Sequence, residues 1–231
     1  MTIETKKAKK SAPRRRLAPE ERRAQIIEAA RALFSEGGLE RVSMRNIARH
    51  VGITQAAIYQ HFEDKDAILF AVAERFFVQL IDRKTKYDNP ALPPVDRLRL
   101  AMRNYVENGL ANPEEYRLLF MTDAPGLRRH APANLIKQEG AGDASGIQPS
   151  RGQIAYSHLQ ELVRELVENG HIRKGDPETI AESIWAAGHG TVSLLITHVD
   201  FLWRADQLID TQINLLMNGL LPDDSPARDG A

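Results

Sequence analysis

The residue types that could do chemistry in this chain are few. The 231-residue sequence contains no cysteine, which excludes disulfide frameworks, thiolate metal sites and cysteine nucleophiles. Its seven histidines show no metal-binding spacing, and we find neither a glycine-rich phosphate loop nor a nucleophile motif. We therefore expect a protein that is not an enzyme and that uses no cofactor and no metal, although distant histidines could still converge in the fold.

Two short helices joined by a glycine turn form the main functional pattern. The helices are expected at 43–50 and 54–60, and Gly52 is the small residue that the turn requires. Ser43 and Thr54 can cap the two helices. A helix-turn-helix of this kind projects the N-terminal residues of its second helix into the major groove of DNA. The bare pattern is weak evidence, because a glycine between two short helices is common.

Three side chains of this pattern suit contact with DNA. Ala56 is small enough to let the second helix approach the base edges, and Gln55 can hydrogen-bond an adenine or a phosphate. Arg45, on the first of the two helices, can reach the DNA backbone. The surrounding elements must therefore hold these two helices with their outer faces free.

Apolar residues recur at helical spacing through most of the chain, and we find no alternating strand pattern and no internal repeat. The predicted fold class is all-α. A first helix should run from Pro19 to Gly37-Gly38, and a fourth should begin at Asp64. Later helices are expected around Leu98–Val106, from Pro113, and at 153–169, 177–198 and 205–220. The stretch from about Glu139 to Ser150 is predicted to be a loop.

The charges are distributed unevenly along the sequence. Basic and acidic residues both number 31, so the formal net charge is zero. Residues 1–16 nevertheless hold seven basic side chains and one acidic one, whereas residues 67–231 hold 17 basic and 22 acidic ones. The basic arm at the N-terminus is expected to be disordered, and it is either a nucleic-acid contact or a solubilising tail. No apolar run approaches the length that crosses a membrane.

Residues 38–69 carry a more specific signature. They read GLERVSMRNIARHVGITQAAIYQHFEDKDAIL, which closely resembles the TetR family of bacterial transcriptional regulators. The resemblance covers about residues 20–69, and His50-Val51 and Ile53 depart from the family pattern only mildly. The residues that carry it are Gly38, Ser43, Ile47-Ala48, Gly52-Ile53-Thr54, Tyr59-Gln60-His61-Phe62, Lys65 and Leu69.

This resemblance implies roles for individual residues in binding a double-stranded DNA operator. Phe62 would be structural and would hold the fourth helix against the motif. Without the resemblance, Tyr59 and His61 would be read as a polar pair satisfied locally at a helix end. The residues implied to contact phosphates are Thr54, Tyr59, His61 and Lys65. The residues implied to lie at or near the groove are Ser43, Arg45, Gln55 and Ala56.

The resemblance also implies the organisation of the whole chain. An arm at 1–17 would precede a helix-turn-helix DNA-binding domain at 18–66, a helical effector-binding and dimerisation domain at 67–221 and a flexible tail at 222–231. The expected protein is a cytoplasmic homodimeric repressor that a small organic effector releases from a palindromic operator. An activator or a ligand-independent regulator of the same family is the alternative. A helical enzyme or a scaffold without DNA binding is more remote, because neither explains residues 38–69.

The second half of the chain resembles one branch of TetR C-terminal domains, through Tyr116–Phe120 and Trp185–Gly190. Trp185 and His189 are four residues apart and share a helix face. Gly188 and Gly190 each cost a helix about 1 kcal/mol against alanine, which suggests a close helix approach or room for a ligand. His189 either packs in the core with a backbone partner or lines a pocket. The candidate effector-binding residues are Met102, Tyr105, Tyr116, Phe120, Trp185 and His189.

The last two predicted helices contain more apolar residues than one helix pair could bury in a monomer. Two subunits could bury them in a four-helix interface that uses the same surface of each. The residues predicted to form this dimer interface are Ile184, Val192, Leu195, Ile196, Leu208, Ile209, Ile213, Leu216 and Met217.

Overall fold

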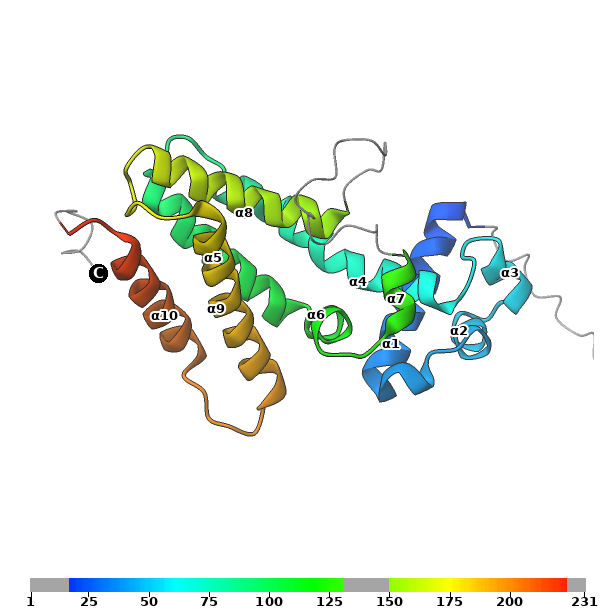
Figure 1. The fold of residues 1–231 in the computed structure, drawn as a ribbon. Coiled ribbons are helices and arrows are strands. Elements are labelled where there is room, and N and C mark those ends of the chain that lie inside the picture. The colour runs from blue at the N-terminus through cyan, green and yellow to red at the C-terminus, as the bar shows by residue number, and fades with distance from the viewer. Residues whose placement is uncertain (1–16, 131–149, 224–231) are drawn as a thin grey trace, which may run out of the picture.

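Prolines, glycines and capping side chains delimit the helices in the computed structural model, which describes residues 17–130 and 150–223 (Figure 1). Every regular element in these residues is a helix, which confirms the all-α prediction. The α-helices are α1 (Pro19–Arg41), α2 (Met44–Val51), α3 (Gln55–Tyr59), α4 (Lys65–Asp82), α5 (Pro94–Ala111), α6 (Pro113–Phe120), α7 (Pro125–His130), α8 (Arg151–Glu168), α9 (Pro177–Thr197) and α10 (Ala205–Leu220), and a 3-10 turn, η1 (Arg83–Lys86), follows α4.

Most helix boundaries lie within two residues of the predicted ones, and the differences have local causes. The backbone leaves the helical conformation at Gly37 and Gly38, where Gly38 has a φ of 66°, but a further helical turn carries α1 on to Arg41. The apolar pattern did not indicate η1 and α7, because both are too short to show a period. The predicted basic arm, almost all of the predicted loop and most of the predicted tail lie outside the described residues.

The helices surround two hydrophobic cores, and α4 contributes to both. In the first core, residues of α4 from Ile68 to Ala73 pack with α1, α2 and α3. In the second core, Phe76 packs with residues of α5, α6, α8, α9 and α10. The predicted domain boundary at residue 66 lies at the start of α4, whereas the division between the cores lies between Ala73 and Phe76.

Figure 1 shows how this arrangement separates the ends of the molecule. Helices α1, α2 and α3 lie at one end, and α4 runs from there alongside α8. The antiparallel pair α9 and α10 lies toward the end of the molecule opposite α1, α2 and α3, with α10 outermost. Helix α6 lies between the two parts and packs against α4 and α1. None of the helices in the described ranges is long and apolar enough to cross a membrane.

The predicted dimer interface stays a prediction, and the structure shows how far its residues are buried within one protomer. Helices α9 and α10 bury one apolar face against α5 and against each other, and six of the nine predicted interface residues lie on that face. Leu195, Leu208 and Leu216 are only half-buried. Because the six side chains are buried within one protomer, little of their surface remains for a partner. The six buried residues are Ile184, Val192, Ile196, Ile209, Ile213 and Met217.

The close approach of α5 to α9 depends on Gly109. A Cβ atom added to Gly109 would lie 2.6 and 2.8 Å from the two methyl groups of Val192. We expect Gly109→Ala to lower the free energy of unfolding by about 1–3 kcal/mol, because the clash outweighs the better helix propensity of alanine. Urea denaturation at one fixed protein concentration would measure this change.

The matched control removes the obstructing methyl groups. In a Val192→Ala background, Gly109→Ala should lower the free energy of unfolding clearly less than it does in the wild-type chain. The double-mutant cycle should therefore show coupling between the two residues. Equal costs in the two backgrounds, or a Gly109→Ala variant as stable as the wild type, would contradict this account of how α5 and α9 pack.

Candidate DNA-reading surface and effector cavity

Local hydrogen bonds fix the turn between α2 and α3. The N–H of Asn46 donates to Ser43 Oγ at 3.1 Å and the N–H of Ala57 donates to Thr54 Oγ1 at 3.2 Å, so each helix has a side-chain cap. Gly52 ends α2 in the left-handed conformation at a φ of 76°, which glycine adopts without strain. The next helix is capped in the same way, because Asp64 Oδ1 accepts from the N–H of Ala67 at 2.7 Å.

The two short helices bury their inner residues and expose the predicted DNA contacts. Ile47 and Ile58 are completely buried in the first core. Phe62, predicted to be structural, is buried as well, and the guanidinium of Arg23 lies 4.4 Å from the centre of its ring. Among the eight predicted DNA contacts, the exposed ones are Arg45, Thr54, Gln55, Ala56 and Tyr59, and the half-buried ones are Ser43, His61 and Lys65.

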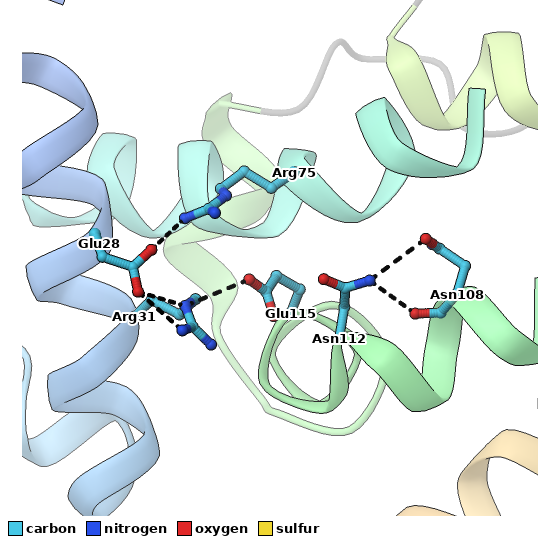
Figure 2. Close-up of polar contacts among 6 residues, drawn as sticks. All are labelled: Glu28, Arg31, Arg75, Asn108, Asn112 and Glu115. Carbon is cyan, nitrogen blue, oxygen red and sulfur yellow. Dashed lines mark hydrogen bonds and ion pairs between the residues drawn. The ribbon is translucent and has the colours of Figure 1, made fainter. Parts of the chain in front are cut away.

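A set of polar contacts joins the DNA-binding end to the rest of the molecule (Figure 2). Glu28 of α1 is bonded to Arg31 at 2.8 Å and to Arg75 of α4 at 2.7 Å. Hydrogen bonds from Arg31 and then from Arg75 lower the pKa of Glu28. Arg31 Nε also lies 3.8 Å from a carboxylate oxygen of Glu115, which is buried in α6. Within residues 17–130 and 150–223, the other oxygen of Glu115 has no hydrogen-bond partner.

Two buried asparagines continue this set of contacts through α5. The amide of Asn108 donates to the main-chain carbonyl of Phe76 in α4 at 3.1 Å. The amide of Asn112 donates to the carbonyl of Asn108 at 2.9 Å (Figure 2). These bonds satisfy polar groups that would otherwise be costly to bury, and they fix the register of α5 and α6 on α4.

A cavity of about 1380 Å³ lies among α4, α5, α8, α9 and α10. The residues of α8 from Gly152 to Gln160 line it, and none of them is fully buried, although Leu162, Val163 and Leu166 further along the same helix are. The first half of α8 is therefore less buried than the second. The sequence did not indicate these residues, because an apolar helix face looks the same whether it meets side chains or a cavity.

The six predicted effector-binding residues divide into two groups in the structure. Met102, Tyr105 and Trp185 line the cavity. Tyr116, Phe120 and His189 do not line it but pack behind it, with Tyr116 completely buried. His189 is half-buried, and the partner of its ring is the side chain of Tyr116, whose hydroxyl lies 2.6 Å from Nδ1.

A chain of hydrogen bonds connects the two groups. The indole N–H of Trp185 donates to the hydroxyl of Tyr105 at 3.0 Å, and this hydroxyl lies 3.3 Å from that of Tyr116, which contacts His189. Burial lowers the pKa of His189 and raises the pKa values of both tyrosines. Gly188 permits this arrangement, since a Cβ atom there would lie 3.1 Å from the ring of Tyr105.

The described residues contain no group of three or more histidine, aspartate or glutamate side chains that could hold a metal ion. An exposed helix-turn-helix lies at one end, and a large, mainly apolar cavity lies in the body.

Comparison with known proteins identifies the family of both parts of the chain. Residues 26–72 match the family described as bacterial regulatory proteins, tetR family, and residues 98–216 match the tetracyclin repressor-like C-terminal domain. The HTH-type transcriptional repressor Rv1474c of Mycobacterium tuberculosis is 42% identical over 52 residues, which are 22% of this chain and 28% of that protein. The HTH-type transcriptional activator FasR of Mycolicibacterium smegmatis is 30% identical over 108 residues, or 47% and 49% of the two chains. The aligned regions thus span about half or less of these curated relatives.

Solved structures share the fold over most of the chain. A protein of unknown function from Rhodococcus sp. RHA1 has a TM-score of 0.69 at 23% identity and covers 92% of this chain and 100% of its own. The fatty acid degradation regulator FadR from Bacillus halodurans has a TM-score of 0.65 at 17% identity, over 90% and 97% of the two chains. Because the C-terminal match alone spans more than half of the 231 residues, the chain belongs to the TetR family of transcriptional regulators.

Proposed function

We propose that this regulator is a homodimeric repressor that leaves a palindromic operator when a small organic effector enters the cavity among α4, α5, α8, α9 and α10. Its family consists of DNA-binding regulators rather than enzymes. The observation that carries the proposal is the pairing of two features in one chain. The predicted DNA contacts are exposed or half-buried at α2, α3 and the start of α4, and a partly open cavity of about 1380 Å³ lies in the body.

The proposed reading surface combines base and phosphate contacts. Gln55 and Ala56 lie in the first turn of α3, where a side chain can meet a base edge. Tyr59 is 56% exposed at the end of α3, and Lys65 is the first residue of α4, so both can reach phosphates. Of the eight assigned contacts, Ser43 and Thr54 also cap helices and therefore have a structural role as well.

The proposed dimer interface is the outer face of α9 and α10. Leu194 is 45% exposed and Leu215 is 68% exposed on this face, although both are large apolar residues. A shallow apolar groove of about 280 Å³ runs between the two helices beside Leu215 and Ile180. A second copy of the chain could cover this surface through a two-fold axis, with the same residues on both sides.

Helix α6 is the proposed link between the cavity and the DNA-binding end. The hydroxyl of Tyr116 in α6 contacts the hydroxyl of Tyr105, a residue that lines the cavity. Glu115, which precedes Tyr116 in α6, faces Arg31 of α1. A displacement of α6 would therefore change both contacts together. An effector shifts such an equilibrium only through a difference in its affinity for the two states.

Activation of transcription is the second candidate function, because FasR, which matches 47% of this chain, is an activator. The two functions use the same reading surface and differ in where the operator lies relative to the promoter. Transcription in vitro from the promoter of an operator-bearing fragment, with and without the protein, separates them by the sign of the effect.

The reading surface can be tested by two substitutions at one fixed salt concentration. Tyr59→Phe should weaken binding to operator and to random DNA by similar factors, because a phosphate carries no base identity. Gln55→Ala should lower the ratio of the two affinities, since a good base contact discriminates by about 1–3 kcal/mol. Fluorescence anisotropy with labelled duplexes measures both affinities.

The control for this test is Gln60→Ala, which removes the same kind of side chain just beyond α3 and should preserve the ratio. If Gln55→Ala lowers the affinities for operator and for random DNA by the same factor, their ratio is unchanged, and Gln55 contacts only the DNA backbone. If none of these substitutions changes binding to any DNA, α2 and α3 are not the reading surface and the proposal fails.

The interface can be tested by charge insertion. Leu215→Glu should give monomers that bind the operator poorly, because two glutamates would be buried beside each other in a symmetric interface. Leu100→Glu places the same charge on α5 at a residue that is 37% exposed, and it should remain dimeric. Light scattering gives the mass of each variant. Dimers of Leu215→Glu would place the interface on another surface.

A further inference from the structure

The cavity is large for a ligand site. Ligand pockets commonly enclose about 300–1,000 Å³, and the value here is about 1380 Å³. Its lining is mainly apolar and aromatic, so an extended apolar molecule is needed to fill it. The polar side chains at its wall then restrict the polar group that such a molecule can carry. The inference below rests on the proposal that this cavity receives the effector.

The charges at the wall disfavour a carboxylate. Arg164 and His158 are the basic side chains among the described residues that line the cavity. The guanidinium of Arg164 lies 2.6 Å from an oxygen of Glu178, and burial followed by the nearby Lys84 lowers the pKa of His158. Glu182 adds a second carboxylate to the lining. An anionic group would thus lie near two glutamates, without a free cation on the described wall.

The hydroxyl of Tyr105 is the best placed donor. The indole of Trp185 can only donate, so Tyr105 accepts from it at 3.0 Å. The proton of Tyr105 can then point toward Tyr116, but the 3.3 Å separation of the two oxygens is long for an O–H···O bond. Tyr116 meanwhile has a much shorter contact of 2.6 Å with His189. The proton of Tyr105 is therefore only weakly held.

The same result follows for either arrangement of protons in the chain. If Tyr116 donates to His189 Nδ1, Tyr105 has only the long contact to Tyr116 as its acceptor. If His189 carries a proton on Nδ1 and donates to Tyr116, then Tyr116 can donate to the main-chain carbonyl of His189 at 3.3 Å or to Tyr105. With the first acceptor Tyr105 keeps only its long contact to Tyr116, and with the second the proton of Tyr105 has no acceptor within this series of hydrogen bonds. In both cases a ligand oxygen can take that proton at the cost of one weak bond or of none.

The two other tyrosines in the lining are less suited to the role. Burial raises the pKa of Tyr156, and Glu182 and then Glu178 raise it further, so its hydroxyl lies in the field of two carboxylates that compete for its proton. Tyr87 follows η1, and burial and then the neighbouring Asp88 raise its pKa to about 12. The ring of Tyr156 lies 5.6 Å from that of Trp185, but among the described residues neither hydroxyl is hydrogen-bonded to the chain that reaches α6 and α9.

We propose that the effector is a long, mainly apolar molecule whose polar group is a neutral carbonyl, as in a ketone, an ester or a thioester, and that the hydroxyl of Tyr105 donates a hydrogen bond to it. A carbonyl oxygen accepts without bringing a charge near Glu178 and Glu182. Its aliphatic or polycyclic body can fill the apolar remainder of the cavity. Binding would also withdraw the proton of Tyr105 from Tyr116, the residue of α6 beside Glu115.

The test compares three probes of equal chain length in the full-length protein. Methyl octyl ketone carries a neutral carbonyl, decanoate an anion and decylamine a cation. Trp203→Phe leaves Trp185, which lines the cavity, as the remaining tryptophan, so its fluorescence reports occupancy. We expect the ketone to bind most tightly of the three. Tighter binding of decanoate or of decylamine would overturn the inferred ligand class.

Variants then test the donor. Tyr105→Phe should weaken binding of the ketone about 2- to 10-fold, the range expected for one hydrogen bond, and leave the other two probes almost unchanged. Tyr156→Phe and Tyr87→Phe remove the same hydroxyl from other parts of the lining and should bind the ketone as the parent does. A loss in either of these variants, with none in Tyr105→Phe, would overturn the assignment to Tyr105.

Operator affinity, measured in parallel without any probe, keeps this inference distinct from the proposed function. It shows that each variant is folded, and it tests DNA binding independently of the ligand. If the protein and its variants bind operator but none of the three probes alters the fluorescence of Trp185, the inferred ligand class is wrong while the assignment of the reading surface stands.

Discussion

The helix α4 belongs to both hydrophobic cores, and the rest of the structure depends on this sharing. Its first half buries Ile68, Leu69 and Val72 among the DNA-binding helices, and its second half buries Phe76 in the body. A single helix of 18 residues is stiff, so the two cores cannot move independently at this point. Any change in the body that tilts the second half of α4 must also move the first half, on which α1, α2 and α3 rest.

Helix α6 provides a second connection of a different character. It contributes Leu118 to the first core and Tyr116 to the second, and Glu115 faces Arg31 at 3.8 Å. This ion pair is loose, and one oxygen of the buried carboxylate has no partner, so the contact stabilises the fold little. By contrast, Asn108 bonds the main chain of Phe76 directly. The hydrogen bond between α5 and α4 is therefore the stronger of the two contacts, and the ion pair between α6 and α1 is the weaker.

The cavity is maintained by residues that pack behind it. Tyr116, Phe120 and His189 form a group of ring contacts, with centroid distances of 4.8 to 5.4 Å, that supports the wall of Tyr105 and Trp185. Gly188 lets α9 approach the ring of Tyr105, and Gly109 lets α5 approach Val192. Close packing on this side contrasts with the half-buried first part of α8 on the other side.

The sequence alone determined the features that depend on local interactions. Ser43, Thr54 and Asp64 cap helices where the sequence places them, Gly52 takes the left-handed turn, and the TetR signature follows from residues 38–69. Periodicity also identified the all-α fold, because the longer helices contain enough apolar residues to show their period.

Only the tertiary structure decided which faces of the last helices are buried and which residues border empty space. Helices α9 and α10 carry apolar residues on more than one face, so the pattern could not show that Val192 and Ile213 point inward while Leu194 and Leu215 point outward. For the same reason it could not separate Trp185, which lines the cavity, from His189, which packs behind it. The physical reason is that periodicity records how residues are distributed around one helix, whereas burial and cavities depend on the neighbours that the fold brings to each face.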